Sequence, residues 1–154
     1  MGEALKAKIK QQADFESPTV EAMINLIIAT DAVRAPFESV CAKHEITQSQ
    51  YNVLRILRGA GEAGHPRCEI AERMAERAPD ITRLIDRLEK QELVERARSD
   101  EDRRLSVSKI SPKGLELLDR MEPELVEINR QISEKMSTAE WIALSSLCEK
   151  IYAD

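Results

Sequence analysis

The sequence predicts a mainly α-helical protein with one small β-hairpin, and two patterns in the chain support this fold class. Apolar residues recur at helical spacing along most of the 154 residues, and one short segment alternates apolar residues with serines. The first pattern buries one stripe of a helix, whereas the second is typical of a strand. Aromatic residues make up only 3% of the chain, so the core should be aliphatic. The expected order is α-α-α-α-β-β-α-α, a winged helix-turn-helix between flanking helices.

Composition and charge limit what this protein can bind. One domain is the expectation for 154 residues, and the net charge of −5 argues against a generally basic nucleic-acid coat. Between residues 67 and 104 there are ten basic and eleven acidic residues, so a cationic surface would depend on which faces these charges occupy. Three cysteines without framework spacing, no apolar signal segment and no run long enough to span a bilayer predict a cytoplasmic protein that does not enter a membrane.

The N-terminal part of the chain predicts a polar arm followed by a long helix. Residues 1–16 are mostly polar and should form a partly disordered arm. Ser17 suits the N-cap of a helix and Pro18 its first position. Apolar residues then follow helical spacing to about His44. Pro36 should kink or restart this helix, because proline lacks a backbone donor and crowds the preceding turn.

Three further helices should complete the helix-turn-helix. Residues 47–50 match a capping box, the helix that they start should stop at Gly59, and a glycine-containing loop leads to a third helix around Ile70. A fourth helix begins near Pro79. Its apolar residues share one buried stripe: Ile81, Leu84, Ile85 and Leu88. The opposite face is polar and bears arginines, which suits a helix that lies in the major groove of DNA.

A charged hairpin and two long helices should follow. Residues 93–98 and 105–110 predict two strands, and the polar stretch between them is the hairpin tip. Ser111 and Pro112 start the next helix, which Pro123 should bend, and residues 137–140 form a second capping box before the last helix. The apolar stripes of the flanking helices are longer than one small winged-helix core can cover. We therefore expect residues 17–46 and 111–154 to form a dimerisation domain around residues 47–110.

Four segments of the chain together resemble the MarR (multiple antibiotic resistance regulator) family. They are Thr82–Lys90, Leu93–Val94, Asp102–Arg104, and Ile110–Ser111 with Gly114. The family pattern is a TRLxDRLE helix, a GLVxR strand, a D[KR]R wing tip and an LTxxG segment before the next helix. The resemblance covers the chain from about Val20 to Ile151.

The resemblance implies a sequence-specific transcription regulator, not an enzyme, that binds a pseudo-palindromic operator as a homodimer. Most members are repressors released by small molecules or oxidation. The recognition helix would enter the major groove of double-stranded DNA and a wing arginine the minor groove. With the polar face of the fourth helix, this gives a set of candidate DNA-binding residues: Pro79, Asp80, Thr82, Arg83, Arg87, Arg98, Arg103 and Arg104. Asp102 should orient a wing arginine, and Arg96 and Arg98 are either phosphate contacts or plain surface.

One position departs from the family pattern. The family usually has glycine where this chain has Glu92. Glycine would serve there as the residue of positive φ that ends the helix. Glutamate must either adopt that conformation, at a cost of roughly 1 kcal/mol, or let the chain leave the helix differently.

Several alternatives concern regulation rather than fold. Cys41, His44, His65 and Cys68 are weak candidates for a metal site, because a helix of about 15 Å separates the two pairs. Cys68 is the best candidate for a redox-active thiol. A small-molecule effector pocket could include Ile27, Asp31 and Tyr51. No cofactor is expected, and a winged-helix scaffold that binds another protein instead of DNA remains an alternative that the acidic balance suggests.

Overall fold

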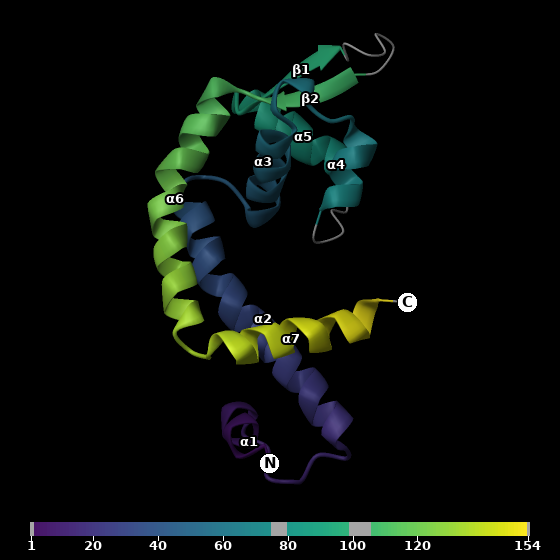
Figure 1. Ribbon diagram of the computed structural model, residues 1–154, viewed down its shortest axis with the longest axis vertical. Helices are drawn as coiled ribbons and strands as arrows, with labels where there is room; N and C mark the ends of the chain where they lie inside the picture. The colour runs from purple at the N-terminus through teal and green to yellow at the C-terminus, as the bar shows by residue number, and fades with distance from the viewer. Residues whose placement is uncertain (1, 75–79, 99–105, 154) are drawn as a thin grey trace. The chain divides into compact units, whose positions relative to one another are not determined.

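The computed structural model describes residues 2–74, 80–98 and 106–153. The chain divides into two compact units, Met1–Phe37 and Glu38–Asp154, and each is described by itself. The elements, in chain order, are α1 (Glu3–Ile9), α2 (Pro18–Lys43), α3 (Gln48–Ala60), the 3-10 helix η1 (Gly61–Ala63), α4 (Arg67–Arg73), α5 (Ile81–Lys90), β1 (Val94–Arg98), β2 (Ser106–Ile110), α6 (Pro112–Ser133) and α7 (Thr138–Tyr152) (Figure 1). This order confirms the predicted fold class, and it adds α1 and η1.

The first unit contains a helix that the sequence did not predict. Helix α1 lies within residues 1–16, which were expected to form a polar, partly disordered arm, and it buries Leu5. Lys6 Nζ also pairs with Asp14 Oδ1 at 2.5 Å. A seven-residue helix is too short to show a helical period in the sequence, so the sequence analysis did not predict α1.

Helix α2 begins where the sequence predicts. The Ser17 hydroxyl accepts a hydrogen bond from the backbone N–H of Val20 at 3.3 Å, which satisfies one of the free donors at the start of the helix. Pro36 lies inside the helix, which continues to Lys43. The helix therefore does not restart at the proline.

The second unit has an aliphatic core, as the low aromatic content predicts. Its largest fully buried side chains come from the end of α2 and from α3, α4, α5 and α6: Cys41, Val53, Leu54, Leu57, Ile70, Ile85, Leu88 and Met121. Helix α3 contributes three of them and starts with the predicted capping box, in which Thr47 and Gln50 satisfy each other's backbone donors. Burial of these side chains holds α5 to the rest of the unit, and the buried Val94 and Val107 hold the hairpin.

The hairpin is a two-stranded antiparallel sheet, and a third segment of chain lies along it. Strand β1 pairs with β2 so that Arg96 stands opposite Ser108. His65 forms an isolated bridge with Ser108, whose backbone N–H and C=O bond to His65 at 2.9 and 3.0 Å. Gly64, at φ +65°, allows this approach, because a Cβ there would lie 2.5 Å from the Ser108 carbonyl oxygen. The sequence analysis predicted only a loop at this place.

The last two helices begin at the predicted caps. The Ser111 hydroxyl accepts from the backbone N–H of Gly114 at 3.0 Å, and Ser137 and Glu140 form the second capping box. Helix α6 contains Pro123 and follows a curved path in Figure 1. Within the described residues, no helix combines the length and apolar character needed to cross a membrane.

Candidate nucleic-acid interface

Helix α5 has the two-faced character expected of a recognition helix. The Asp80 carboxylate caps it by accepting a hydrogen bond from the backbone N–H of Arg83 at 3.0 Å. Ile85 and Leu88 are fully buried, whereas the other two apolar residues of the predicted stripe are only partly buried. Its basic side chains are all exposed: Arg83, Arg87 and Lys90. The buried face fixes the helix to the core and leaves the arginine-bearing face toward solvent.

The cations on the exposed face differ in how they are held. Arg83 Nε lies 3.0 Å from Asp80 Oδ2, yet 81% of the Arg83 side chain is exposed. Arg87 has no ion pair among the described residues. Because an exposed ion pair contributes little stability, Arg83 can exchange its carboxylate for a phosphate or a base at small cost.

Arg67, at the start of α4, belongs to the same surface although the sequence analysis did not include it. Its Nη1 donates to the Thr82 hydroxyl at 3.3 Å, and the arginine side chain is exposed. This contact joins the first helix of the helix-turn-helix to the second. Only the tertiary fold brings these two residues together, because they are 15 positions apart in the chain.

The first strand of the wing places its arginines beside α5. Successive side chains of a strand alternate between the faces of the sheet, so Val94, Arg96 and Arg98 project from one face. Val94 is buried, and Arg96 pairs with Asp86 and Glu89 of α5, so this face is the one against α5. Arg98 is exposed and lies further along the same face, toward the wing tip.

The turn from α5 to β1 shows how Glu92 replaces the usual glycine. Glu92 adopts φ +61°. Its N–H donates to the Glu89 carbonyl at 2.8 Å and the N–H of Leu93 to the Leu88 carbonyl at 2.9 Å, the two bonds of a Schellman motif. Glutamate therefore takes the left-handed conformation, the first of the two predicted alternatives. Lys113 Nζ, 2.8 Å from Glu92 Oε2, lowers the pKa of this carboxyl.

Ser111 and Gly114 fasten this turn to α6, which explains why both stand at the start of that helix. The Ser111 hydroxyl donates to the Glu92 carbonyl at 2.7 Å, and the Ser111 N–H donates to the Leu93 carbonyl at 3.1 Å. A Cβ on Gly114 would lie 2.4 Å from the same Leu93 oxygen. The direction in which the wing leaves α5 is therefore set by contacts with α6.

The structure does not test several of the predicted site residues. Pro79, Asp102, Arg103 and Arg104 lie outside the described residues, so their roles stay predictions. Of the suggested effector pocket, Ile27 and Asp31 belong to the first unit and Tyr51 to the second. Tyr51 is buried, and the Arg55 guanidinium lies 5.9 Å from the centre of its ring.

Among the four candidate metal ligands, each histidine lies beside a glutamate, and the two cysteines differ in burial. His44 Nε2 lies 2.9 Å from Glu124 Oε1, and His65 Nδ1 lies 2.8 Å from Glu69 Oε2. Cys41 is buried, which raises the pKa of its thiol to about 11, whereas Cys68 is exposed. Among residues 2–74, 80–98 and 106–153, no cluster of three or more histidines, cysteines or carboxylates could hold a metal ion.

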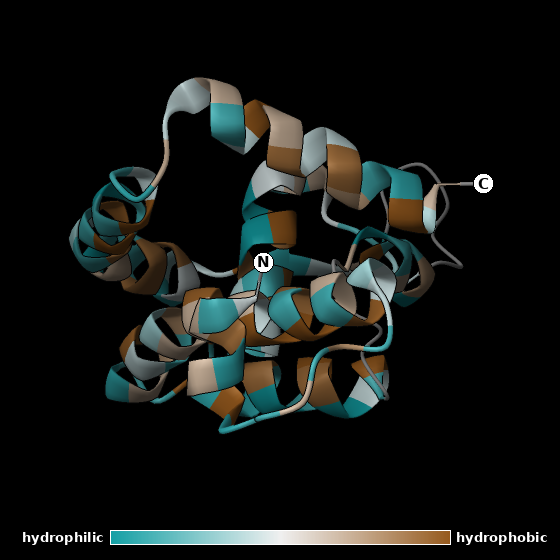
Figure 2. Ribbon diagram, turned by 90° about the horizontal axis from the view of Figure 1, so that it is seen from below, coloured by the Kyte–Doolittle hydropathy of each residue, from teal (hydrophilic) through white to brown (hydrophobic). Residues whose placement is uncertain are grey.

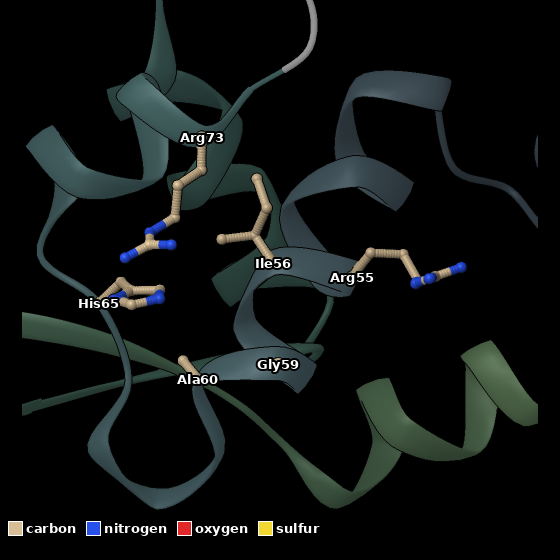
Figure 3. A pocket seen from close by; sticks show the side chains of 6 residues that line it. All are labelled: Arg55, Ile56, Gly59, Ala60, His65 and Arg73. Atoms are coloured by element: carbon tan, nitrogen blue, oxygen red, sulfur yellow. The ribbon is translucent and has the colours of Figure 1, made fainter.

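A pocket of about 430 Å³ lies between α3, α4 and the loop after η1. Figure 3 shows Arg73 and His65 turned toward each other over Ile56, while Arg55 points away. Glu69 pairs with both His65 and Arg73, at 2.8 and 3.7 Å, and Arg55 donates to the Tyr51 hydroxyl. The charges around the pocket are thus already partnered, and the pocket does not resemble an open anion site.

The fold and this surface define a winged helix-turn-helix protein, in which an arginine-bearing helix lies beside a β-wing. Residues 46–106 match the MarR family. A MarR transcription factor from Planctomyces limnophilus is 35% identical, with a TM-score of 0.66 over 88% of this chain and 98% of that one. The chain therefore belongs to the MarR family of DNA-binding transcription regulators.

Two further comparisons agree with this assignment. The homoprotocatechuate degradative operon repressor of Escherichia coli is 26% identical over 84% of this chain and 86% of its own. The structure of the MepR–DNA complex of S. aureus has a TM-score of 0.71 at 18% identity, over 90% of this chain and 97% of that one, which shows the shared fold. The E. coli and Planctomyces limnophilus relatives are transcription regulators and not enzymes, which agrees with the prediction from sequence.

Proposed function

We propose that this protein is a repressor that binds a pseudo-palindromic operator as a homodimer. The observation that carries the proposal is the exposed arginine face of α5 beside the wing strand. The α5 face would enter the major groove, where the fork of Arg83 can donate two hydrogen bonds to a guanine. The name of the E. coli relative supports the repressor role. Such a protein would act in the cytoplasm, where bacterial DNA lies.

The wing completes the proposed interface. Arg98 projects on the α5 side of the wing, and the sequence between the two strands contains Asp102, Arg103 and Arg104. An arginine at such a tip suits a narrow minor groove, where the negative potential of DNA is deepest. We assign Arg104, with Arg103, to this groove, and Asp102 to orienting one of them.

The proposed homodimer would cover apolar side chains that the single chain leaves exposed. Helix α7 has no buried residue, although its sequence is rich in apolar residues (Figure 2). The exposed large side chains of this helix are Ile142, Leu144, Leu147, Ile151 and Tyr152. These side chains are spread around the 15-residue helix, and a helix that is apolar on several sides is typical of a buried or protein–protein contact. A second copy is the partner that also matches a two-fold operator.

We further propose that a small aromatic acid relieves the repression. The support is the name of the E. coli relative, which regulates the degradation of homoprotocatechuate. Titration calorimetry with a series of phenolic acids, repeated with the operator present, tests this step. An effector must weaken operator binding and be bound less tightly by the DNA complex, because coupling between two ligands is reciprocal.

Selection of duplexes from a random library by the wild-type protein tests DNA binding. A repeated, two-fold related half-site is the expected result, with an affinity that falls steeply with salt concentration. Arg83→Ala should then weaken binding to the selected duplex by about 1–3 kcal/mol. Arg120→Ala, an exposed arginine on α6, is the control and should change the affinity little. Failure to select any duplex, combined with salt-insensitive capture of a protein, would favour the scaffold alternative.

A further inference from the structure

The recognition helix has no net positive charge of its own. With its cap, residues 80–90, it contains three basic residues (Arg83, Arg87 and Lys90) and three acidic ones (Asp80, Asp86 and Glu89), so the charges cancel. DNA phosphates repel unpaired carboxylates, and each of them would weaken docking in the groove. A net positive charge at this surface therefore requires a basic residue from outside the helix.

We propose that Arg96 of strand β1 supplies that charge and is a positioning residue for DNA binding. Its pairs with Asp86 and Glu89, which we name the Arg96 bridge, neutralise carboxylate charge on α5 and fix the wing against the recognition helix. Arg96 would act through these two residues and would not contact DNA itself. The inference rests on the DNA binding proposed above.

The geometry of the Arg96 bridge supports this role. Arg96 Nη2 lies 2.5 Å from Asp86 Oδ1, and Arg96 Nε lies 2.6 Å from Glu89 Oε1. Asp86 and Glu89 are one helical turn apart and therefore face the same way. The planar guanidinium can reach both carboxylates at once, whereas a lysine ammonium would be a single point charge.

One atom of the bridge is buried, although the Arg96 and Asp86 side chains are 46% and 45% exposed. The Oε1 atom of Glu89 is inaccessible to solvent and has no hydrogen-bond partner among the described residues, so the Arg96 guanidinium is its source of compensation. Without Arg96 a carboxylate oxygen would be left uncompensated, and the side chain would have to turn outward to be solvated. Outward movement would bring negative charge toward the face that carries Arg83 and Arg87.

The backbone of the wing holds Arg96 in place. Arg96 is paired with Ser108 across the sheet, and Ser108 is in turn bonded to His65. Arg96 is therefore the middle residue of β1, and β2, the central strand, joins it to the His65 segment. The bridge joins this ladder to α5 and adds to the contacts with α6 that direct the wing.

A mutant cycle separates this role from a direct phosphate contact. Arg96→Met is made in the wild type and in the Asp86→Asn/Glu89→Gln variant, and the affinity for a fluorescein-labelled duplex selected with the wild type is measured by anisotropy. The loss of one positive charge is the same in both backgrounds. We expect about a tenfold weakening in the wild type and less than about a twofold weakening in the neutralised background, because coupled residues are not additive.

Two controls complete the design. Arg130 on α6 also pairs with two carboxylates, Glu127 and Glu134, so Arg130→Met removes the same kind of cluster away from α5 and should leave the affinity unchanged. Thermal unfolding of every variant identifies a temperature at which all are folded, and binding is measured there. Arg96→Lys should lie between the wild type and Arg96→Met.

The outcomes distinguish this inference from the function on which it rests. Equal losses in the two backgrounds would make Arg96 a phosphate contact and overturn the positioning role. The slope of log affinity against log salt concentration should then also fall by about 0.9 on removing the arginine. A wild-type protein that selects no duplex would overturn the proposed function itself.

Discussion

Two single glycines permit the close backbone contacts that surround the wing. Gly64 and Gly114 are close to the backbone oxygens of Ser108 and Leu93, and a Cβ at either glycine would meet that oxygen at 2.5 Å or less. Gly59, in contrast, lies in α3 with no atom within 4 Å of an added Cβ. The same residue type is therefore a steric requirement at two positions and a conformational weakness at the third.

We predict opposite effects for two glycine-to-alanine changes. Gly114→Ala should lower the free energy of unfolding by about 2 kcal/mol, because the added methyl must displace backbone or Ile110. Gly59→Ala should raise it by about 0.5–1 kcal/mol, since alanine loses less conformational freedom in a helix. Urea denaturation of the two variants and the wild type measures both values. A stabilising Gly114→Ala change would contradict the close approach of α6 to the turn.

The left-handed conformation of Glu92 leads to a second residue-scale prediction. Glu92→Gly should relieve roughly 1 kcal/mol of backbone strain, offset in part by the loss of an exposed ion pair with Lys113. We therefore expect a small gain in thermal stability at neutral pH. Glu45 is a second glutamate at positive φ, at 60° after the end of α2, and Glu45→Gly gives a comparison without a Lys113 pair. A clear loss of stability in both variants would argue against left-handed strain.

At the scale of elements, ion pairs fasten the end of α2 to α6. Glu124 of α6 accepts from Lys43 Nζ at 2.8 Å and lies 2.9 Å from His44 Nε2. The hydrogen bond from Lys43 is the main cause, and that from His44 the second, of a lowered pKa for the Glu124 carboxyl. Both helices belong to the segments that the sequence analysis expected to support dimerisation.

Glu124 should make part of the stability depend on pH. A carboxyl whose folded pKa lies below its ordinary value of 4.5 stabilises the fold above that pH, and the contribution disappears as the pH falls through the lowered pKa. Glu124→Gln should therefore lower the melting temperature at pH 7, and the difference from the wild type should shrink in acid. Glu122→Gln, a neighbour without an ion pair among the described residues, should show neither effect. A difference that stays constant down to acid pH would rule out this contribution.

The cap of the recognition helix is a further element-scale feature. Asp80→Ala should lower the free energy of unfolding by about 1 kcal/mol, because the Arg83 N–H loses its side-chain acceptor. Asp80→Asn keeps an acceptor oxygen and should restore most of that stability. If Asp80→Ala is neutral in urea denaturation, α5 does not depend on this cap.

At the scale of the whole molecule, the unburied apolar surface supports the proposed homodimer. Ile142 and Leu147 on α7 are 64% and 58% exposed, although they are among the most apolar side chains of the chain. Monomeric proteins seldom leave several such residues uncovered on one helix. One chain offers a single recognition helix, whereas a two-fold operator needs two.

The double variant Ile142→Glu/Leu147→Glu should convert the protein from dimer to monomer. Two buried carboxylates without partners would disfavour the interface strongly. Sedimentation equilibrium should show the change in mass, and the affinity for the selected operator should fall by several orders of magnitude. Ala63→Glu, on the exposed η1, adds charge elsewhere and should stay dimeric. A wild type that sediments as a monomer would remove the basis of this prediction.

The sequence by itself determined the order of the elements from α2 onward, except η1, and the two faces of α5. Capping patterns at residues 47, 111 and 137 and the apolar stripe of residues 81–88 are local, and local hydrogen bonds and burial periodicity act over a few neighbours. The family motifs gave the fold class for the same reason, because they record these local requirements. Helix α1 was missed because its seven residues carry too little pattern.

Only the tertiary structure decided how the charges of the site are shared. The bridge from Arg96 to Asp86 and Glu89, the contact of Arg67 with Thr82, and the pairing of His65 with Ser108 each join residues that no local rule connects. Their partners depend on how α4, α5 and the wing pack on α3. A count of charges along the sequence therefore left open whether the surface is positive or negative. The packing showed which carboxylates are neutralised and which arginines are exposed.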